Sequence, residues 1–234
     1  MAKKKEPMET VEELVETEEC ACPECAEIDL SQMAGMASSS SFTYGLEDTL
    51  LMEDMEERKL FIRDTITSNV YDYITYHIMR YNTMDMGLLA EERQPIKLYI
   101  STNGGFTFDG LGICEVIRNS ITPVIGICTS YAFSMGFYIY ISCDYRYATK
   151  NAMFLNHEGE DGALGHPSKI RDYMKFSDKL EKRLNKLVIS RTKLTSRDLN
   201  ETERIEDYYF GDEAKEFGIV DSIIGEDCTI EDIL

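Results

Sequence analysis

Residues 123–136 read Pro-Val-Ile-Gly-Ile-Cys-Thr-Ser-Tyr-Ala-Phe-Ser-Met-Gly, and this stretch decides the class of fold. Its first six residues are typical of a buried strand, and a second apolar run follows at residues 137–141. Ser134 therefore lies where a strand gives way to a helix. Unpaired N–H groups at a helix start stabilise negative charge, so this serine is a candidate nucleophile as well as an ordinary helix cap.

A second strand and a pair of glycines precede this corner. Residues 96–100 (Ile-Lys-Leu-Tyr-Ile) predict a buried strand, Gly104 and Gly105 follow it, and residues 109–120 have a helical pattern. Paired glycines allow close approach of the backbone, as an oxyanion hole requires, but they also occur in plain tight turns. The alternation of strand and helix predicts a parallel sheet with right-handed crossovers.

A base and an acid for such a serine can be found downstream. His157 follows the apolar run at residues 152–155, as a histidine at a strand end would. A serine nucleophile needs a base to remove its proton, and the base needs a carboxylate to fix its tautomer. Asp207 follows later in the chain, which makes the order of the candidate triad Ser134, His157 and Asp207.

The two other histidines are weaker candidates for the base. His77 falls on the apolar face of a helix predicted from residue 68 to residue 81, which favours a role in the core or at an interface. His166 lies in a polar loop just before Pro167 and is a rival base.

Four blocks, taken in order, resemble the proteolytic subunit of the Clp protease (the ClpP family of self-compartmentalising serine peptidases). They are Asn-Gly-Gly at 103–105, Ala-Phe-Ser-Met-Gly at 132–136, Asn-His-Glu at 156–158 and Asp-Glu-Ala-Lys-Glu-Phe-Gly-Ile-Val-Asp-Ser-Ile at 212–223. Each block alone is modest, and their order makes the signal specific. The resemblance implies an α/β fold of the ClpP/crotonase type, with repeated βαβ units around a mainly parallel sheet and a long projecting helix.

The resemblance also implies roles for individual residues. Ser134 would be the nucleophile and His157 the general base, and the N–H groups of Gly104 and Met135 would form the oxyanion hole. Asn103 stands where the family usually has proline. This departure alters the turn but leaves the N–H donors of the oxyanion hole in place.

The acid of the triad has two candidates. The family's aspartate falls on Glu206 if the chain has no gap, and on Asp207 if one residue is deleted before Gly211. We expect Asp207, because an aspartate followed by an aromatic residue suits the family better.

The activity implied is that of an ATP-dependent serine endopeptidase, which hydrolyses unfolded polypeptides inside a chamber of stacked, heptameric rings. The chain has no Gly-x-x-x-x-Gly-Lys-Ser/Thr loop, so an AAA+ unfoldase would be the separate partner that uses ATP. No cofactor or metal is expected at the site. Residues 170–191 predict a long amphipathic helix, which in the family projects and interlocks the two rings.

Two other functions stay open at this point. A ring subunit of the same fold with an unproductive triad would also fit the ambiguous acid and the departure at Asn103. A crotonase-type enzyme acting on an acyl-coenzyme A would share the fold, but it would not need a serine and a histidine. The long acidic N-terminus indicates a specialised, phage-type member.

Composition fits one α/β domain. The chain has 234 residues, 43% of them hydrophobic. A formal net charge of −19 argues against nucleic acid as a partner, and no apolar run is long enough for a membrane span. Without the apolar core of a signal peptide, we expect a cytoplasmic protein with its seven cysteines reduced.

Residues 1–45 predict an acidic, flexible extension, and residues 46–234 predict a single ClpP-like peptidase domain. Cys20, Cys22 and Cys25 lie close enough in the extension to contribute to a zinc site. No second Cys/His pair follows at the spacing of a zinc finger, so we expect free thiols there.

Overall fold

The computed structural model describes residues 46–157, 159, 162–202 and 206–233. The predicted extension, with Cys20, Cys22 and Cys25, lies outside the described residues. Residues from Leu46 onward form one unit, and the domain boundary near residue 45 stays a prediction.

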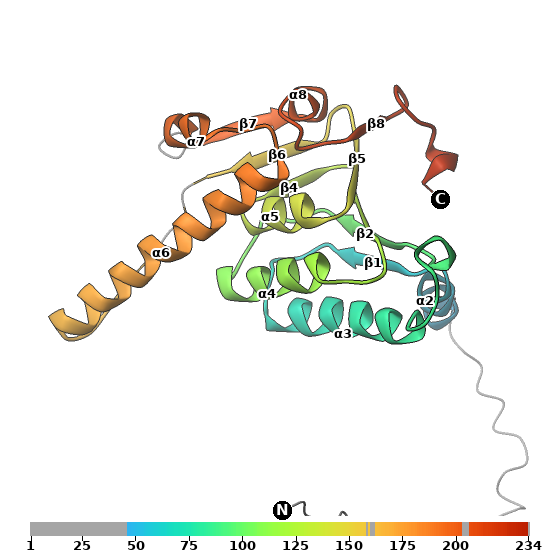
Figure 1. Cartoon of the computed structure of the whole chain (residues 1–234), viewed down its shortest axis with the longest axis horizontal. Helices are drawn as coiled ribbons and strands as arrows, with labels where there is room; N and C mark the ends of the chain where they lie inside the picture. Colours follow the sequence, from blue (N-terminus) through green and yellow to red (C-terminus); the bar gives the residue numbers. More distant parts are fainter. Residues whose placement is uncertain (1–45, 158, 160–161, 203–205, 234) are drawn as a thin grey trace, which may run out of the picture. The chain divides into compact units, whose positions relative to one another are not determined.

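A parallel sheet of five strands forms the centre of this unit, in the order β1-β2-β3-β5-β8 (Figure 1). All four pairings in it are parallel, as the alternation of strands and helices predicts. Its strands are β1 (Lys59–Ile62), β2 (Ile96–Ile100), β3 (Val124–Cys128), β5 (Tyr145–Thr149) and β8 (Ser222–Ile224). In β2, Ile96, Leu98 and Ile100 are buried and the residues between them are half-buried, so alternate side chains point into the core.

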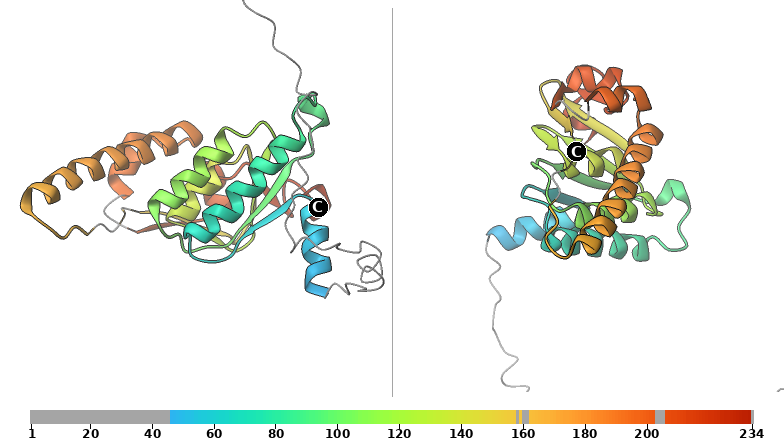
Figure 2. Two further views of the ribbon diagram at one scale, coloured as in Figure 1. Left: turned by 90° about the horizontal axis from the view of Figure 1, so that it is seen from below. Right: turned by 90° about the vertical axis from the view of Figure 1, so that its left-hand side faces the viewer.

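Helices cover one face of this sheet (Figure 2). These are α3 (Ser68–Met84), α4 (Thr107–Arg118) and α5 (Met135–Ser142), with α3 packed on α4 and α4 on α5. Every residue of α5 is buried, which explains why residues 137–141 are apolar on all sides of the helix. A shorter helix, α2 (Leu46–Glu56), precedes β1.

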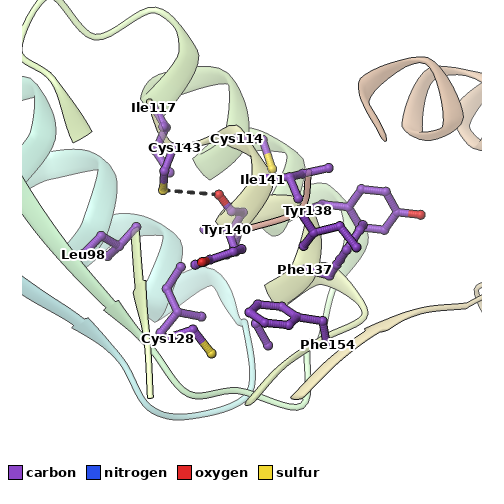
Figure 3. Close-up of a cluster of buried hydrophobic side chains, with 14 of the residues drawn as sticks. Leu98, Cys114, Ile117, Cys128, Phe137, Tyr138, Tyr140, Ile141, Cys143 and Phe154 are labelled. Atoms are coloured by element: carbon purple, nitrogen blue, oxygen red, sulfur yellow. Dashed lines mark hydrogen bonds between the residues drawn. The ribbon is translucent and has the colours of Figure 1, made fainter. Parts of the chain in front are cut away.

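The hydrophobic core lies between these helices and the sheet (Figure 3). Cys114, Cys128 and Cys143 are free and buried in it. Burial raises the pKa of the Cys114 and Cys128 thiols to about 12 each, so they stay protonated and pack as small apolar side chains.

A second, three-stranded sheet carries the candidate site. Its order is β4-β6-β7, from β4 (Tyr131–Phe133), β6 (Met153–Asn156) and β7 (Asp207–Phe210), with β4 parallel and β7 antiparallel to β6. The helix α7 (Ser196–Thr202) precedes β7, α8 (Gly211–Glu216) follows it, and short 3-10 turns lie at Ala90–Glu92 and Ile230–Asp232.

The long helix α6 (Pro167–Arg191) projects from the rest of the unit (Figure 1). Its 25 residues extend about 37 Å, and only Leu187 and Val188 among them are buried. It begins three residues earlier than predicted, because His166 caps it and Pro167 is well tolerated in the first turn. No helix among the described residues is both long and apolar enough to cross a membrane.

Candidate active site

Ser134 occupies a strained corner between β4 and α5. Its backbone has φ 51° and ψ −123°, and only Arg58 shares a positive φ among the described residues other than glycine. The corner is fixed on both sides, since the N–H of Ser134 donates to the carbonyl of Leu155 at 2.9 Å and its carbonyl accepts from Phe137 at 2.9 Å. The strand-to-helix corner predicted at this serine is therefore present. A strain of this kind often marks a functional position.

The glycine pair packs directly against this corner. Gly104 has φ 97°, and a Cβ added to it would lie 2.7 Å from the Cβ of Ser134 and 3.0 Å from the nitrogen of Met135. A Cβ on Gly105 would lie 2.3 Å from the carbonyl oxygen of Ile66. Two adjacent positions thus have no room for a side chain, which explains the Gly-Gly sequence.

The two glycines differ in what their N–H groups do. The N–H of Gly104 donates to Thr102 Oγ1 at 3.1 Å, and that hydroxyl donates to the carbonyl of Asp64 at 2.7 Å. The N–H of Gly105 has no acceptor among the described residues, and Gly105 lines the same cavity as Ser134 and Met135. Gly104 as the oxyanion donor stays a prediction, and Gly105 is a second candidate because it lines the cavity.

That cavity has a volume of about 470 Å³ and lies between the small sheet and α6. One wall holds Asn103, Gly105, Thr107, Ser134, Met135, Tyr138, Asn156, His157 and Gly159. The opposite wall is one face of α6, with residues three or four apart: Met174, Ser177, Asp178, Leu180, Glu181, Leu184 and Asn185. A cleft of this shape can hold an extended chain between the helix and the glycine pair.

His157 reaches the cavity from the end of β6. Because β4 and β6 are parallel and pair Phe133 with Leu155, their carboxyl ends meet at one edge of the small sheet. Ser134 and His157 follow these ends directly, and both line the cavity. No hydrogen bond joins the two side chains within the described part of the chain.

The acid assignment depends on the pairing of β6 with β7. Asn156 faces Asp207 in this antiparallel register, and continuing it by one residue brings Glu206 opposite His157. The register brings both candidates for the acid close to the end of β6, and the choice between Asp207 and Glu206 stays a prediction. Sequence alone could not detect this proximity, because the partner of a strand residue depends on how the two strands align.

The remaining histidines have structural surroundings. His77 is buried on α3 between the rings of Tyr73 and Tyr76, at centroid distances of 4.8 and 5.2 Å. Burial lowers the pKa of His77, and the positive charge of Arg80 lowers it further. His166 caps α6, where its Nδ1 lies 2.9 Å from the hydroxyl of Ser168. Neither histidine lines the cavity, so His157 is the candidate base.

Asn156 is a site residue that sequence reasoning missed. It is buried beside His157, and its Oδ1 accepts a hydrogen bond from the hydroxyl of Tyr138 at 2.8 Å. Both residues line the cavity, so this bond ties the end of β6 to α5 beneath Ser134. The signal available in the sequence was a polar residue at the end of an apolar strand.

A protein-family model described as Clp protease matches residues 44–227. This span contains both sheets, the glycine pair, the corner at Ser134, and His157 and Glu206 at the ends of β6 and β7. Since the match covers most of the chain and every element that lines the cavity, the chain belongs to the Clp protease family.

Proposed function

We propose that the chain is a serine endopeptidase whose nucleophile is Ser134 and whose general base is His157. The observation that carries this proposal is the shared cavity, in which Ser134, His157 and the Gly105 backbone meet from three separate segments. Membership of the Clp protease family supports the same reading.

The chemistry is acyl transfer in two steps. Ser134 Oγ bonds to the carbonyl carbon of a peptide while its proton passes to His157, which then gives the proton to the leaving amine as the C–N bond breaks. Water attacks the acyl-enzyme through the same base, which releases the carboxylate product and restores Ser134. The N–H groups of Met135 and Gly105 stabilise the oxyanion, each by about 3 kcal/mol in sites of this kind.

A carboxylate at the start of β7 completes the triad in this proposal. The cross-strand register supports Glu206 in this role rather than Asp207. A carboxylate beside the imidazole fixes its tautomer and stabilises the imidazolium that forms during the reaction.

The proposal extends to a homo-oligomer of stacked rings, with an AAA+ unfoldase that supplies unfolded polypeptide. Support comes from the family match and from α6, which projects with two buried residues out of 25. A phosphate loop for ATP is missing from the sequence, so ATP would be used by the unfoldase. The heptameric state and the cytoplasmic location stay predictions.

One observation favours a second candidate, a ring subunit of the same family without activity of its own. In the described residues no hydrogen bond links Ser134 to His157, so the single chain has no aligned nucleophile and base. Catalytic hydrogen bonds often tighten only when a complex forms, so we rank this candidate second.

The decisive test is labelling by a fluorophosphonate probe together with hydrolysis of a fluorogenic peptide, with the full chain in its assembled form. Ser134→Ala should abolish both signals, and His157→Ala should reduce both strongly. His166→Ala is the matched control, since His166 caps α6 outside the cavity, and it should keep both signals. If the native chain shows neither signal, even with an unfoldase present, the inactive subunit is the correct reading.

A further inference from the structure

The charged residues of α6 are distributed unevenly around the helix. The helix carries eight lysines and arginines and only three acidic residues, which are Asp172, Asp178 and Glu181. Two of the three acids line the cavity opposite Ser134, and none of the eight basic residues of the helix does. A helix with an excess of positive charge therefore presents negative charge to the cavity.

The wall across from α6 does not neutralise these acids. Among the described residues that form it, none is a lysine or an arginine, and His157 is the only basic side chain. Asp178 has no hydrogen bond or ion pair with any residue that the structure describes. The third acid of the helix differs, because Asp172 Oδ1 lies 3.6 Å from Lys175 Nζ. A cleft lined by one sign of charge attracts the opposite sign.

Apolar side chains flank the two acids on the cavity face of α6. Met174 lies one turn before Asp178, and Leu184 lies one turn after Glu181. Leu180 lines the cavity between the acids, and Leu184 packs against the hydrophobic core. Lysine and arginine side chains have the matching composition, since each has an apolar stem and a charged end.

The length of this wall limits where such a side chain would lie in a bound peptide. From Met174 to Asn185 the cavity face extends about 16 Å along the helix, at about 1.5 Å per residue. An extended chain covers this length with about five residues. Ser134 lines the same cavity. A peptide residue that meets the acids is therefore close in sequence to the bond that Ser134 attacks.

We propose that Asp178 and Glu181 make the cavity select polypeptide segments with a lysine or an arginine within about five residues of the cleaved bond. This inference rests on the proposed function and names the substrate class of that same site. The two carboxylates determine specificity through the charge of the bound chain, and the proton transfers stay with His157.

A general attraction of cations has to be separated from this local one, because the chain has a formal net charge of −19. Asp172→Asn is the matched control, since it removes one negative charge from the same helix outside the cavity. Asp178→Asn removes the same charge inside the cavity. Both positions are exposed, so both variants should unfold at the temperature of the native chain.

The kinetic experiment uses the full assembled chain and fluorogenic peptides that differ only in carrying lysine or glutamate at one position near the cleaved bond. The native chain should prefer lysine at the best position by at least about 10-fold in kcat/KM. Asp178→Asn and Glu181→Gln should each reduce this preference about 3- to 10-fold, mainly through KM, and Asp172→Asn should leave it within about 2-fold. The preference should also weaken with added salt.

A second readout does not require activity. Fluorescence anisotropy measures the binding of the same lysine and glutamate peptides, carrying a fluorophore, to the Ser134→Ala chain. This chain should bind the lysine peptide more tightly. Adding Asp178→Lys to it should shift the preference toward the glutamate peptide, because the charge at that point of the cavity is reversed. A purely structural role of Asp178 would not produce this shift.

The two readouts separate the two proposals. A native chain without labelling or hydrolysis that still binds the lysine peptide more tightly contradicts the peptidase and supports the role of the acids. A labelled, active chain that cleaves both peptides equally contradicts only that role. So does a lysine preference that falls as much in Asp172→Asn as in Asp178→Asn.

Discussion

The guanidinium of Arg58 donates two hydrogen bonds, each of 2.7 Å, to the two carboxylate oxygens of Asp85. Asp85 is 1% exposed, and its Oδ2 also accepts from the hydroxyl of Thr122 at 2.6 Å. The pair joins the start of β1 to the end of α3 and to the turn before β3. A buried carboxylate with this many donors is stable in the charged form.

Removing one partner of this pair should destabilise the fold strongly. Asp85→Asn leaves the charge of Arg58 buried without its counter-ion, and the expected loss is about 3–5 kcal/mol in the free energy of unfolding. The control is Glu226→Gln, which breaks the exposed ion pair with Lys150 and should cost less than about 1 kcal/mol. Denaturant titration at fixed protein concentration measures both, and equal losses would contradict the prediction.

The same pair predicts a pH dependence. Hydrogen bonding from Arg58 holds the pKa of Asp85 below its ordinary value, although burial acts in the opposite direction. A carboxylate whose pKa is lowered by folding stabilises the fold at pH values above its ordinary pKa. This contribution disappears as the pH falls through the lowered pKa. The difference in stability between the native chain and Asp85→Asn should therefore shrink below roughly pH 4. A difference that stays constant from pH 7 to the acid transition would show that the charge of Asp85 contributes nothing.

Gly104→Ala should inactivate Ser134 by displacing it, although the serine side chain itself is unchanged. The added Cβ would lie 2.7 Å from the Cβ of Ser134, and displacements near 1 Å at a catalytic group can cost about 10²-fold in rate. Gly87→Ala is a matched control, because Gly87 also has a positive φ (88°) but no atom within 4 Å of an added Cβ. Fluorophosphonate labelling should drop in the first variant and persist in the second. Equal labelling of both would mean that the corner tolerates the Cβ.

The strained backbone of Ser134 predicts a difference between two inactive variants. Ser134→Gly relieves a positive φ that costs on the order of 1–3 kcal/mol, whereas Ser134→Ala keeps it. Allowing for the greater freedom of glycine in the unfolded chain, Ser134→Gly should be about 1 kcal/mol more stable than Ser134→Ala. Thermal unfolding of the two proteins side by side measures this, and a more stable alanine variant would argue against strain at the corner.

Local patterns predict much of this fold. The apolar strand before Ser134, the strand before the glycine pair and the amphipathic run of α6 are visible because burial imposes a period on a short stretch of sequence. The strand β5 was not foreseen, since Tyr145-Arg-Tyr-Ala-Thr149 has a polar and aromatic composition, and its place is set by pairing with β3.

The sequence predicts candidate site residues where their position depends on local order, and it leaves alternatives open where their role depends on distant contacts. Ser134 and His157 each follow a strand, which a single stretch of sequence reveals. Which of the two glycines has an N–H group available for an oxyanion depends on Thr102, whose Oγ1 accepts a hydrogen bond from the N–H of Gly104. The choice between Glu206 and Asp207 depends on a strand register that joins residues about fifty positions apart.

The projecting helix α6 has a consequence for how substrate and protein affect one another. Its cavity-facing residues, from Met174 to Asn185, lie on turns N-terminal to its two buried residues, Leu187 and Val188. Turns with so little buried surface are among the first parts of a protein to open locally. Any chain bound in the cavity therefore orders this helix by the same free energy with which an ordered helix holds that chain. The affinity of the cavity for a bound chain and the local stability of α6 therefore depend on one another. The amide hydrogens of α6 should exchange more slowly when the cavity is occupied than when it is empty.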